Sequence, residues 1–146
     1  MEVWGIILSY VPPPTYTVSF LFRKILIPYD GSDNSRRALD IAIDFAKRYG
    51  SKLVVLIVEE AGIDAKKLIK FVEELAFKEG VKIDVKTRKP NVYSSTANEI
   101  LREIIEGGYD LVILGARGNT INEDLLIGST ALAAIINAPI SVMVVR

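Results

Sequence analysis

From Arg23 onward, two kinds of hydrophobic pattern alternate along the chain, and this alternation limits its fold more than any other feature. Short apolar runs are typical of strands buried on both faces of a sheet, whereas apolar residues spaced three and four apart are typical of helices. Five such runs, at 23–30, 52–58, 81–88, 110–115 and 141–145, are separated by four helical patterns. The alternation predicts one doubly wound α/β domain with a five-stranded parallel sheet and helices on both faces.

Glycines and a capping pair mark the ends of the expected helices. Gly50 follows the first helical pattern and Gly80 the second, where a left-handed residue commonly closes a helix. The third helix should end at the glycine pair 107–108. Thr96 and Glu99 have the spacing of a capping box, which would begin that helix at Thr96.

The expected strand order is 3-2-1-4-5, which makes the first and fourth strands neighbours. In doubly wound sheets, ligands bind beyond the carboxyl ends of the strands, at the point where the strand order reverses. Asp30 ends the first expected strand and Gly115 ends the fourth. Both residues should therefore face the position at which this fold binds ligands.

Two missing residue types exclude several kinds of chemistry. The chain has no cysteine and no histidine, which rules out disulfides, thiol catalysis, a Ser-His-Asp relay and the commonest zinc ligands. Lysine plus arginine number 18, as do aspartate plus glutamate, so no net charge attracts nucleic acid or an anionic membrane. Neither of these is expected as a partner, and a nucleotide would have to be held by a local site.

The first 22 residues differ from the rest and are expected to form an extension, with the domain itself at 23–146. The apolar stretch 3–11 is too short to span a bilayer. Glu2 and a triple proline at 12–14 are not typical of a secretory signal. The apolar stretch is expected to be strand-like or disordered, residues 15–22 could add an edge strand, and the protein is expected to be cytoplasmic.

The sequence GARGNTINEDLLIGST follows the fourth expected strand and contains more glycine than a plain turn needs. Gly115 and Gly118 can adopt positive φ and bring backbone N–H groups close to an anion, because they have no Cβ. Gly128, Ser129 and Thr130 open the last helix, whose first turn has unpaired N–H groups and a partial positive charge. The pattern is neither a Walker A loop nor a Gly-x-Gly-x-x-Gly turn. Two interpretations remain: a phosphate site built from backbone, or a long surface loop in which Ser129 is an ordinary N-cap.

This glycine spacing, together with the opening KILIPYDGSDNSRRAL, resembles the universal stress protein family. Gly-x-x-Gly, nine residues and then Gly-Ser match the nucleotide-binding signature of that family, and the resemblance covers 23–146 in the right order. The resemblance implies a protein of stress response or signalling that binds ATP, or ADP or AMP. Its nucleotide-binding residues would be Pro28, Asp30, Val58, Leu114, Gly115, Arg117, Gly118, Gly128, Ser129 and Thr130.

For the adenosine end, the resemblance implies roles for Asp30 and Val58. Asp30, with Pro28 before it, stands where ATP-binding members place an acid near the adenosine or a metal, so it could hold Mg²⁺ through water. The backbone of Val58 would read the edge of the adenine, although its side chain has the pattern of a core strand residue. An alternative for Asp30 is an Asp-Gly turn, with Ser32 or Asp33 capping the first helix.

For the ribose and phosphates, the resemblance implies the residues around the glycines. Leu114 and Gly115 would lie against the base and ribose, Gly118 by the ribose or phosphates, and residues 128–130 at the phosphates. Arg117 could pair with a phosphate or be a solvated surface arginine, and both readings are open.

The loop also departs from the family at Glu123 and Asp124, where many relatives have basic or neutral residues. Two carboxylates would repel a triphosphate unless they face solvent or hold Mg²⁺. Phosphate binding is therefore less firmly indicated than the base pocket.

Three functions are compatible with these patterns. In the first, an adenine nucleotide orders the glycine loop of a signalling module and changes the surface offered to a partner. The second is slow Mg²⁺-dependent ATP hydrolysis, in which Asp30 could hold the metal through water and Arg117 could stabilise charge, but no water-orienting residue is found. The third is a nucleotide-free interaction protein.

For each of these functions, the apolar strand 141–145 should form a sheet edge that favours pairing, and the resemblance implies a homodimer through this strand.

Overall fold

The computed structural model describes residues 21–118 and 126–146. Most of the expected N-terminal extension lies outside the described residues, and so do Glu123 and Asp124. None of the helices in the described ranges is long and apolar enough to cross a bilayer.

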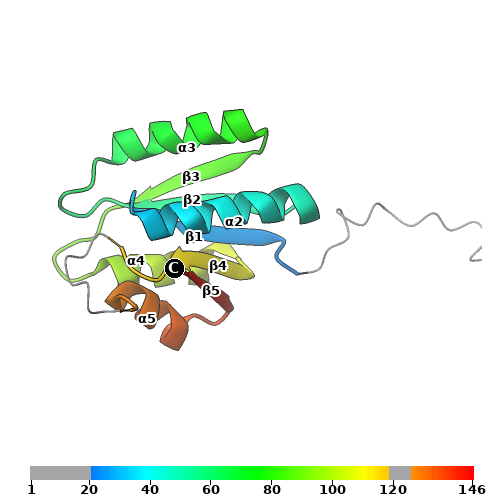
Figure 1. The fold of residues 1–146 in the computed structure, drawn as a ribbon. Helices are drawn as coiled ribbons and strands as arrows, with labels where there is room; N and C mark the ends of the chain where they lie inside the picture. Colours follow the sequence, from blue (N-terminus) through cyan, green and yellow to red (C-terminus); the bar gives the residue numbers. More distant parts are fainter. Residues whose placement is uncertain (1–20, 119–125) are drawn as a thin grey trace, which may run out of the picture.

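Strands and helices alternate along the described chain, as the hydrophobic patterns predict (Figure 1). In chain order they are β1 (Lys24–Pro28), α2 (Asp33–Tyr49), β2 (Lys52–Val58), α3 (Ala65–Glu79), β3 (Ile83–Arg88), α4 (Thr96–Gly107), β4 (Leu111–Gly115), α5 (Ser129–Asn137) and β5 (Ser141–Val145). The sheet has the order β3-β2-β1-β4-β5, and every neighbouring pair is parallel. The predicted fold class and strand order are thus confirmed.

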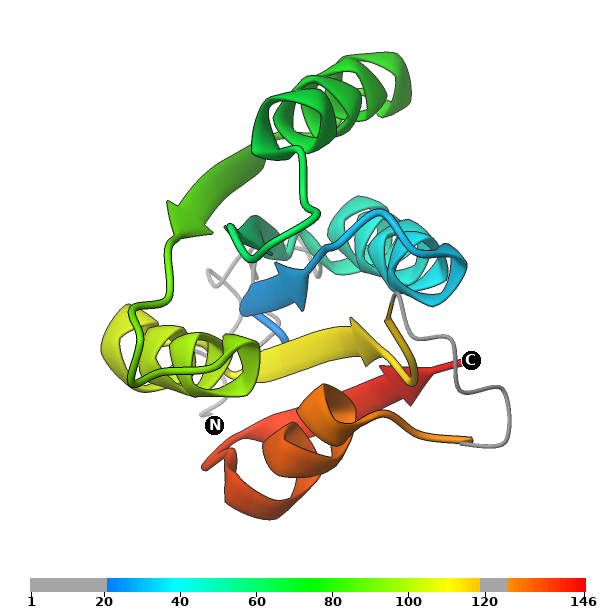
Figure 2. The ribbon, with the colours of Figure 1, turned by 90° about the vertical axis from the view of Figure 1, so that its left-hand side faces the viewer.

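The strands are apolar on both sides because each side of the sheet is covered by helices. Successive residues of β1 show this most clearly: Ile25 and Ile27 pack with α2 and α3, whereas Leu26 packs with α4 and α5. All three side chains are fully buried, as the period-two alternation of a strand requires. Figure 2 shows α2 and α4 on opposite sides of the sheet.

The predicted glycine caps are confirmed, but the predicted capping box is wrong. Gly50, Gly80 and Gly108 close α2, α3 and α4 with φ of 70°, 68° and 70°. Helix α4, however, is capped by Ser95, whose hydroxyl accepts a 3.2 Å hydrogen bond from the backbone N–H of Asn98. Ser95 is therefore the N-cap, because its hydroxyl accepts the hydrogen bond from the backbone N–H three residues later.

Candidate functional site

A cavity of about 280 Å³ opens where β1 and β4 leave the sheet side by side. This is the point at which the strand order reverses, where doubly wound folds bind ligands. The walls come from the ends of β1, β2 and β4 and from the beginnings of α2, α4 and α5. All ten residues predicted from the sequence line this one cavity: Pro28, Asp30, Val58, Leu114, Gly115, Arg117, Gly118, Gly128, Ser129 and Thr130.

The sequence reasoning missed nine further residues that line the cavity. They are Tyr29, Ser32, Ser35, Leu56, Glu60, Thr96, Ile100, Ala116 and Ala131. Several could have been found from their position alone, because every residue just after a parallel strand, or in the first turn of the next helix, lies at the same end of the sheet. Glu60 follows β2, and Thr96 begins α4.

One end of the cavity is apolar and is formed by core side chains. Leu56, Val58, Ile100 and Leu114 line it and are each at least nine-tenths buried in the core beneath α4 and α5. The side chain of Val58 is therefore a core residue, as its pattern predicted. Its carbonyl accepts a 2.9 Å hydrogen bond from the backbone N–H of Glu60. A flat aromatic ligand could replace water against these side chains without any rearrangement of the backbone.

Asp30 organises the turn that leads from β1 to α2. Its Oδ1 accepts hydrogen bonds from the backbone N–H of Ser32 at 3.0 Å, the Ser32 hydroxyl at 2.5 Å and the Ser35 hydroxyl at 2.8 Å. Ser32 is the N-cap of α2, and Gly31 completes the turn with a φ of 84°. The turn interpretation of Asp30 is thus confirmed, and the same carboxylate also lines the cavity.

Gly115 and Gly118 could adopt positive φ but do not, and the structure instead requires glycine at both positions for close approach. A Cβ on Gly115 would lie 2.8 Å from backbone atoms of Asn34 and Ser35. A Cβ on Gly118 would lie 2.5 Å from Oδ2 of Asp30. The two glycines therefore let the chain after β4 pack directly against the beginning of α2 and the Asp30 carboxylate.

The chain returns to the cavity at Gly128, the N-cap of α5. Its backbone N–H donates a 2.6 Å hydrogen bond to the carbonyl of Ala116, which fixes the start of α5 beside the end of β4. Ser129 is the first residue of the helix and not its N-cap, so that interpretation of Ser129 is wrong. Ser129 and Thr130 occupy the first turn, where backbone N–H groups have no partner within the helix.

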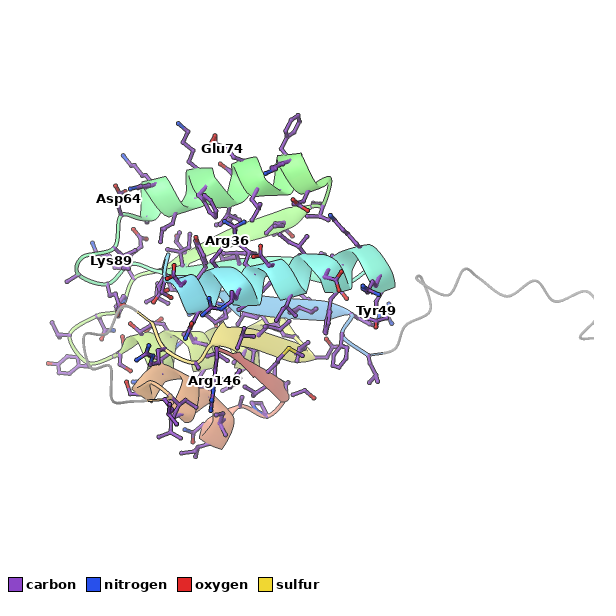
Figure 3. The ribbon with its side chains drawn as sticks, in the orientation of Figure 1. Arg36, Tyr49, Asp64, Glu74, Lys89 and Arg146 are labelled. Atoms are coloured by element: carbon purple, nitrogen blue, oxygen red, sulfur yellow. The ribbon has the colours of Figure 1, made fainter. Side chains whose placement is uncertain are left out.

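Arg117 and Tyr29 also line the cavity and carry polar groups. Arg117 is half-buried in the cavity wall and is not a fully solvated arginine. Tyr29 is buried and stacks on Phe71 of α3, with ring centroids 6.0 Å apart. Arg36 of α2, which is labelled in Figure 3, lies over the same Phe71 ring at 4.9 Å. Burial raises the pKa of the Tyr29 hydroxyl despite the nearby Arg36, so this hydroxyl remains protonated at neutral pH.

A cluster of charged groups around the buried Glu103 holds α4, which forms one wall of the cavity. Glu103 of α4 is 3% exposed and accepts hydrogen bonds from the Tyr109 hydroxyl at 2.6 Å, Lys86 Nζ at 3.0 Å and Arg88 Nε at 3.0 Å. Burial favours the neutral acid, but these three hydrogen bonds outweigh it and lower the pKa of Glu103. Arg88 also lies 3.6 Å from Glu99. The charged groups thus connect β3 to the helix that leads into Thr96 and Ile100.

No group of three or more acidic residues in the described ranges 21–118 and 126–146 is arranged to hold a metal ion. Asp30 is the acid predicted for Mg²⁺, and its Oδ1 already accepts three hydrogen bonds within the turn. Mg²⁺ commonly retains several waters and binds one or two carboxylates together with phosphate oxygens. The described residues therefore fit a metal bound through water, and not one enclosed by protein ligands.

Comparison with known proteins gives one consistent result. The sequence profile of the Universal stress protein family matches residues 21–146. A universal stress protein of Methanocaldococcus jannaschii is 31% identical over 141 residues, which covers 86% of this chain and 83% of that protein.

Two solved structures share the fold. A universal stress protein in complex with cAMP has 22% identity and a TM-score of 0.69, over 86% of this chain and 98% of that one. A universal stress protein from Archaeoglobus fulgidus in complex with dAMP has 20% identity and a TM-score of 0.67, over 87% of this chain and 100% of that one.

Proposed function

This chain belongs to the universal stress protein family, and we propose that it binds an adenine nucleotide in the cavity between β1 and β4. ATP is the first candidate, with ADP and AMP as alternatives. The observation that carries the proposal is that all ten predicted nucleotide-binding residues line one cavity with an apolar end and a polar end. The two neighbours of the same fold that hold cAMP and dAMP support an adenine nucleotide.

In the proposed complex, the base occupies the apolar end. Adenine would lie among Leu56, Val58, Ile100 and Leu114, with its edge toward the backbone of Val58. The ribose would follow along Gly115 toward Asp30. Removal of this flat ring from water provides most of the affinity, because it buries apolar surface against side chains that are already fixed.

The phosphates would lie at the beginning of α5. The unpaired N–H groups of its first turn and the helix dipole favour an anion there. The hydroxyls of Ser129 and Thr130 and the guanidinium of Arg117 border the same part of the cavity. The Gly128 N–H is already bonded to Ala116, so the donors proposed for the phosphate are those of residues 129–131 and the side chains.

A ligand of about 30 non-hydrogen atoms gains roughly 0.3 kcal/mol per atom, which corresponds to micromolar affinity or better. Titration calorimetry with ATP, ADP and AMP, with and without Mg²⁺, tests the proposal. Measurable heat with at least one of them is expected, and no binding to any of them would reject it. If Mg²⁺ binds through water near Asp30, it should strengthen ATP binding more than AMP binding.

Ser129→Glu gives a sharper test of the phosphate end. Ser129 is exposed, and a carboxylate in the first turn of a helix is favourable for the fold. The variant should therefore fold normally but repel phosphate, and its affinity for ATP should fall at least tenfold. Adenosine, which has no phosphate, is the matched ligand and should bind the variant and the natural chain equally.

The proposed biological role is a nucleotide-dependent signalling or stress-response module that acts as a homodimer. The edge strand β5 pairs only with β4 in the described sheet, so its outer edge can receive a second strand. Helix α5 lies beside β5 and has Leu132, Ile135 and Ile136 exposed by 46%, 47% and 69%. An antiparallel pairing of two β5 strands would cover these side chains around a twofold axis.

A further inference from the structure

Glu60 and Thr96 meet at the apolar end of the cavity. Glu60 lies two residues beyond the end of β2, and Thr96 is the first residue of α4. The Thr96 hydroxyl donates a hydrogen bond to Oε2 of Glu60, and both residues line the cavity. Neither residue is among the ten predicted to bind the nucleotide, and the proposed binding of the nucleotide uses neither.

The position of this pair defines which part of a nucleotide it can meet. The phosphate end of the cavity is at residues 128–131, at the beginning of α5. Glu60 follows β2 and Thr96 begins α4, and these two elements supply Val58 and Ile100 of the apolar end. A nucleotide with its phosphates at α5 therefore presents the outer edge of its base to Glu60, and not its ribose or phosphates.

The chemistry of Glu60 in this position is that of an acceptor. Its backbone N–H is occupied by the carbonyl of Val58 at 2.9 Å, so the group left to face the base is the side-chain carboxylate. An ionised carboxylate can accept hydrogen bonds but cannot donate one. Because the Thr96 hydroxyl donates to one of its oxygens, the carboxylate is held in place with acceptor capacity remaining.

We propose that Glu60 is a specificity-determining residue that selects purine nucleotides with an amino group at position 6 over those with a carbonyl there. A 6-amino group donates a hydrogen bond to the carboxylate, whereas a 6-carbonyl places two acceptors against each other. This inference rests on the proposed function, since it requires a nucleotide in the cavity. Glu60 is exposed, so water can relieve part of the repulsion and the selectivity is moderate.

The test compares AMP with IMP, in which a carbonyl replaces the 6-amino group and N1 carries a proton. The natural chain should bind AMP about fivefold more tightly than IMP, which is the effect of one partly exposed hydrogen bond to a charged group. Glu60→Gln should abolish this preference, because the amide can donate to a 6-carbonyl as well as accept from a 6-amino group. Thr96→Val should reduce the preference while leaving the carboxylate present.

Glu59→Gln is the matched control, because Glu59 is the adjacent exposed carboxylate and is not part of the cavity lining. It should leave the ratio of AMP to IMP affinity unchanged. Equal binding of AMP and IMP to the natural chain, or an unaltered ratio in Glu60→Gln, would overturn the inference and leave nucleotide binding intact. Absence of binding of AMP, ADP and ATP to the natural chain would instead overturn the proposed function, and this inference with it.

Discussion

Gly118 and the carboxylate of Asp30 are in such close contact that a Cβ built on the glycine would lie 2.5 Å from Oδ2. The other carboxylate oxygen, Oδ1, accepts hydrogen bonds from Ser32 and Ser35 in the turn before α2. Gly128, at the other end of the glycine loop, is different: a Cβ there would meet Ala116 O at 3.5 Å, which is ordinary van der Waals contact. A side chain at position 118 would therefore clash with Asp30, whereas position 128 has room for a methyl group.

Gly118→Ala should weaken nucleotide binding about tenfold and change the free energy of unfolding by less than about 1 kcal/mol. The added methyl group displaces the Asp30 carboxylate, a side-chain end, so the cavity changes more than the core does. Calorimetry with ATP and urea unfolding measure the two effects. Gly128→Ala is the comparison variant, and a loss of affinity as large as that of Gly118→Ala would contradict the steric explanation.

Gly115→Ala should instead destabilise the whole domain, by about 2 kcal/mol or more. Its Cβ would overlap backbone atoms of Asn34 and Ser35 at the beginning of α2, and backbone cannot move aside as a carboxylate can. Overpacking of this kind typically costs 1–3 kcal/mol. The midpoint of urea unfolding measures it, and a midpoint equal to that of the natural chain would show that α2 can shift without cost.

Glu103→Gln should lower the free energy of unfolding by about 2 kcal/mol at pH 7, because it removes the buried negative charge that accepts hydrogen bonds from Arg88, Lys86 and Tyr109. The effect should also depend on pH. The pKa of Glu103 is below its ordinary value of 4.5 in the folded protein, so its contribution is complete above that value. The contribution is lost as the pH falls through the lower, folded pKa.

Urea unfolding between pH 7 and pH 3 measures this dependence. The natural chain should lose stability below about pH 4.5 more steeply than Glu103→Gln does. Glu74→Gln provides the control, because Glu74 is an exposed carboxylate on the outer side of α3 (Figure 3). If both variants follow the natural chain at every pH, the buried cluster does not account for the loss of stability in acid.

Ile135→Lys should convert the proposed homodimer into a monomer. Ile135 lies on α5 beside the edge strand and is 47% exposed, and a lysine in a buried interface would lose its hydration without a partner. Light scattering coupled to size-exclusion chromatography measures the mass. Phe77→Lys is the control, since Phe77 is 91% exposed on α3, at the other end of the sheet order. A natural chain that is already monomeric would refute the dimer itself.

The fold could be predicted from the sequence because the apolar runs and the glycine caps both indicate the observed strands and helices. Continuous apolar runs such as Lys52–Val58 are strands because helices cover both faces, and the three glycine caps occur where the helical patterns end. Boundaries were less well predicted: β3 begins at Ile83 and not at Val81, and Ser95 replaces Thr96 as the cap of α4. Neighbouring hydroxyl residues have similar capping propensities, so the sequence alone cannot choose between them.

The site was predicted in position but not in detail. Residues that follow parallel strands meet at one end of the sheet, which made Asp30 and Gly115 accessible to sequence reasoning. The steric requirement for glycine at position 115 could not be predicted, because the close contact with Asn34 exists only after β4 and α2 have packed. The bond between Tyr109 and Glu103 depends in the same way on a turn that brings the start of β4 back to α4. Such contacts depend on distances in the packed domain and leave no periodic pattern in the chain.

The cavity walls extend from Pro28 to Ala131 and are contributed by three strands and three helices. No partly folded chain that lacks one of these elements has the complete cavity. A nucleotide would therefore recognise only the finished domain and would draw the folding equilibrium toward it, by about 2.7 kcal/mol at a concentration one hundred times its dissociation constant. The thermal stability of this chain should therefore rise with the concentration of any nucleotide that it binds.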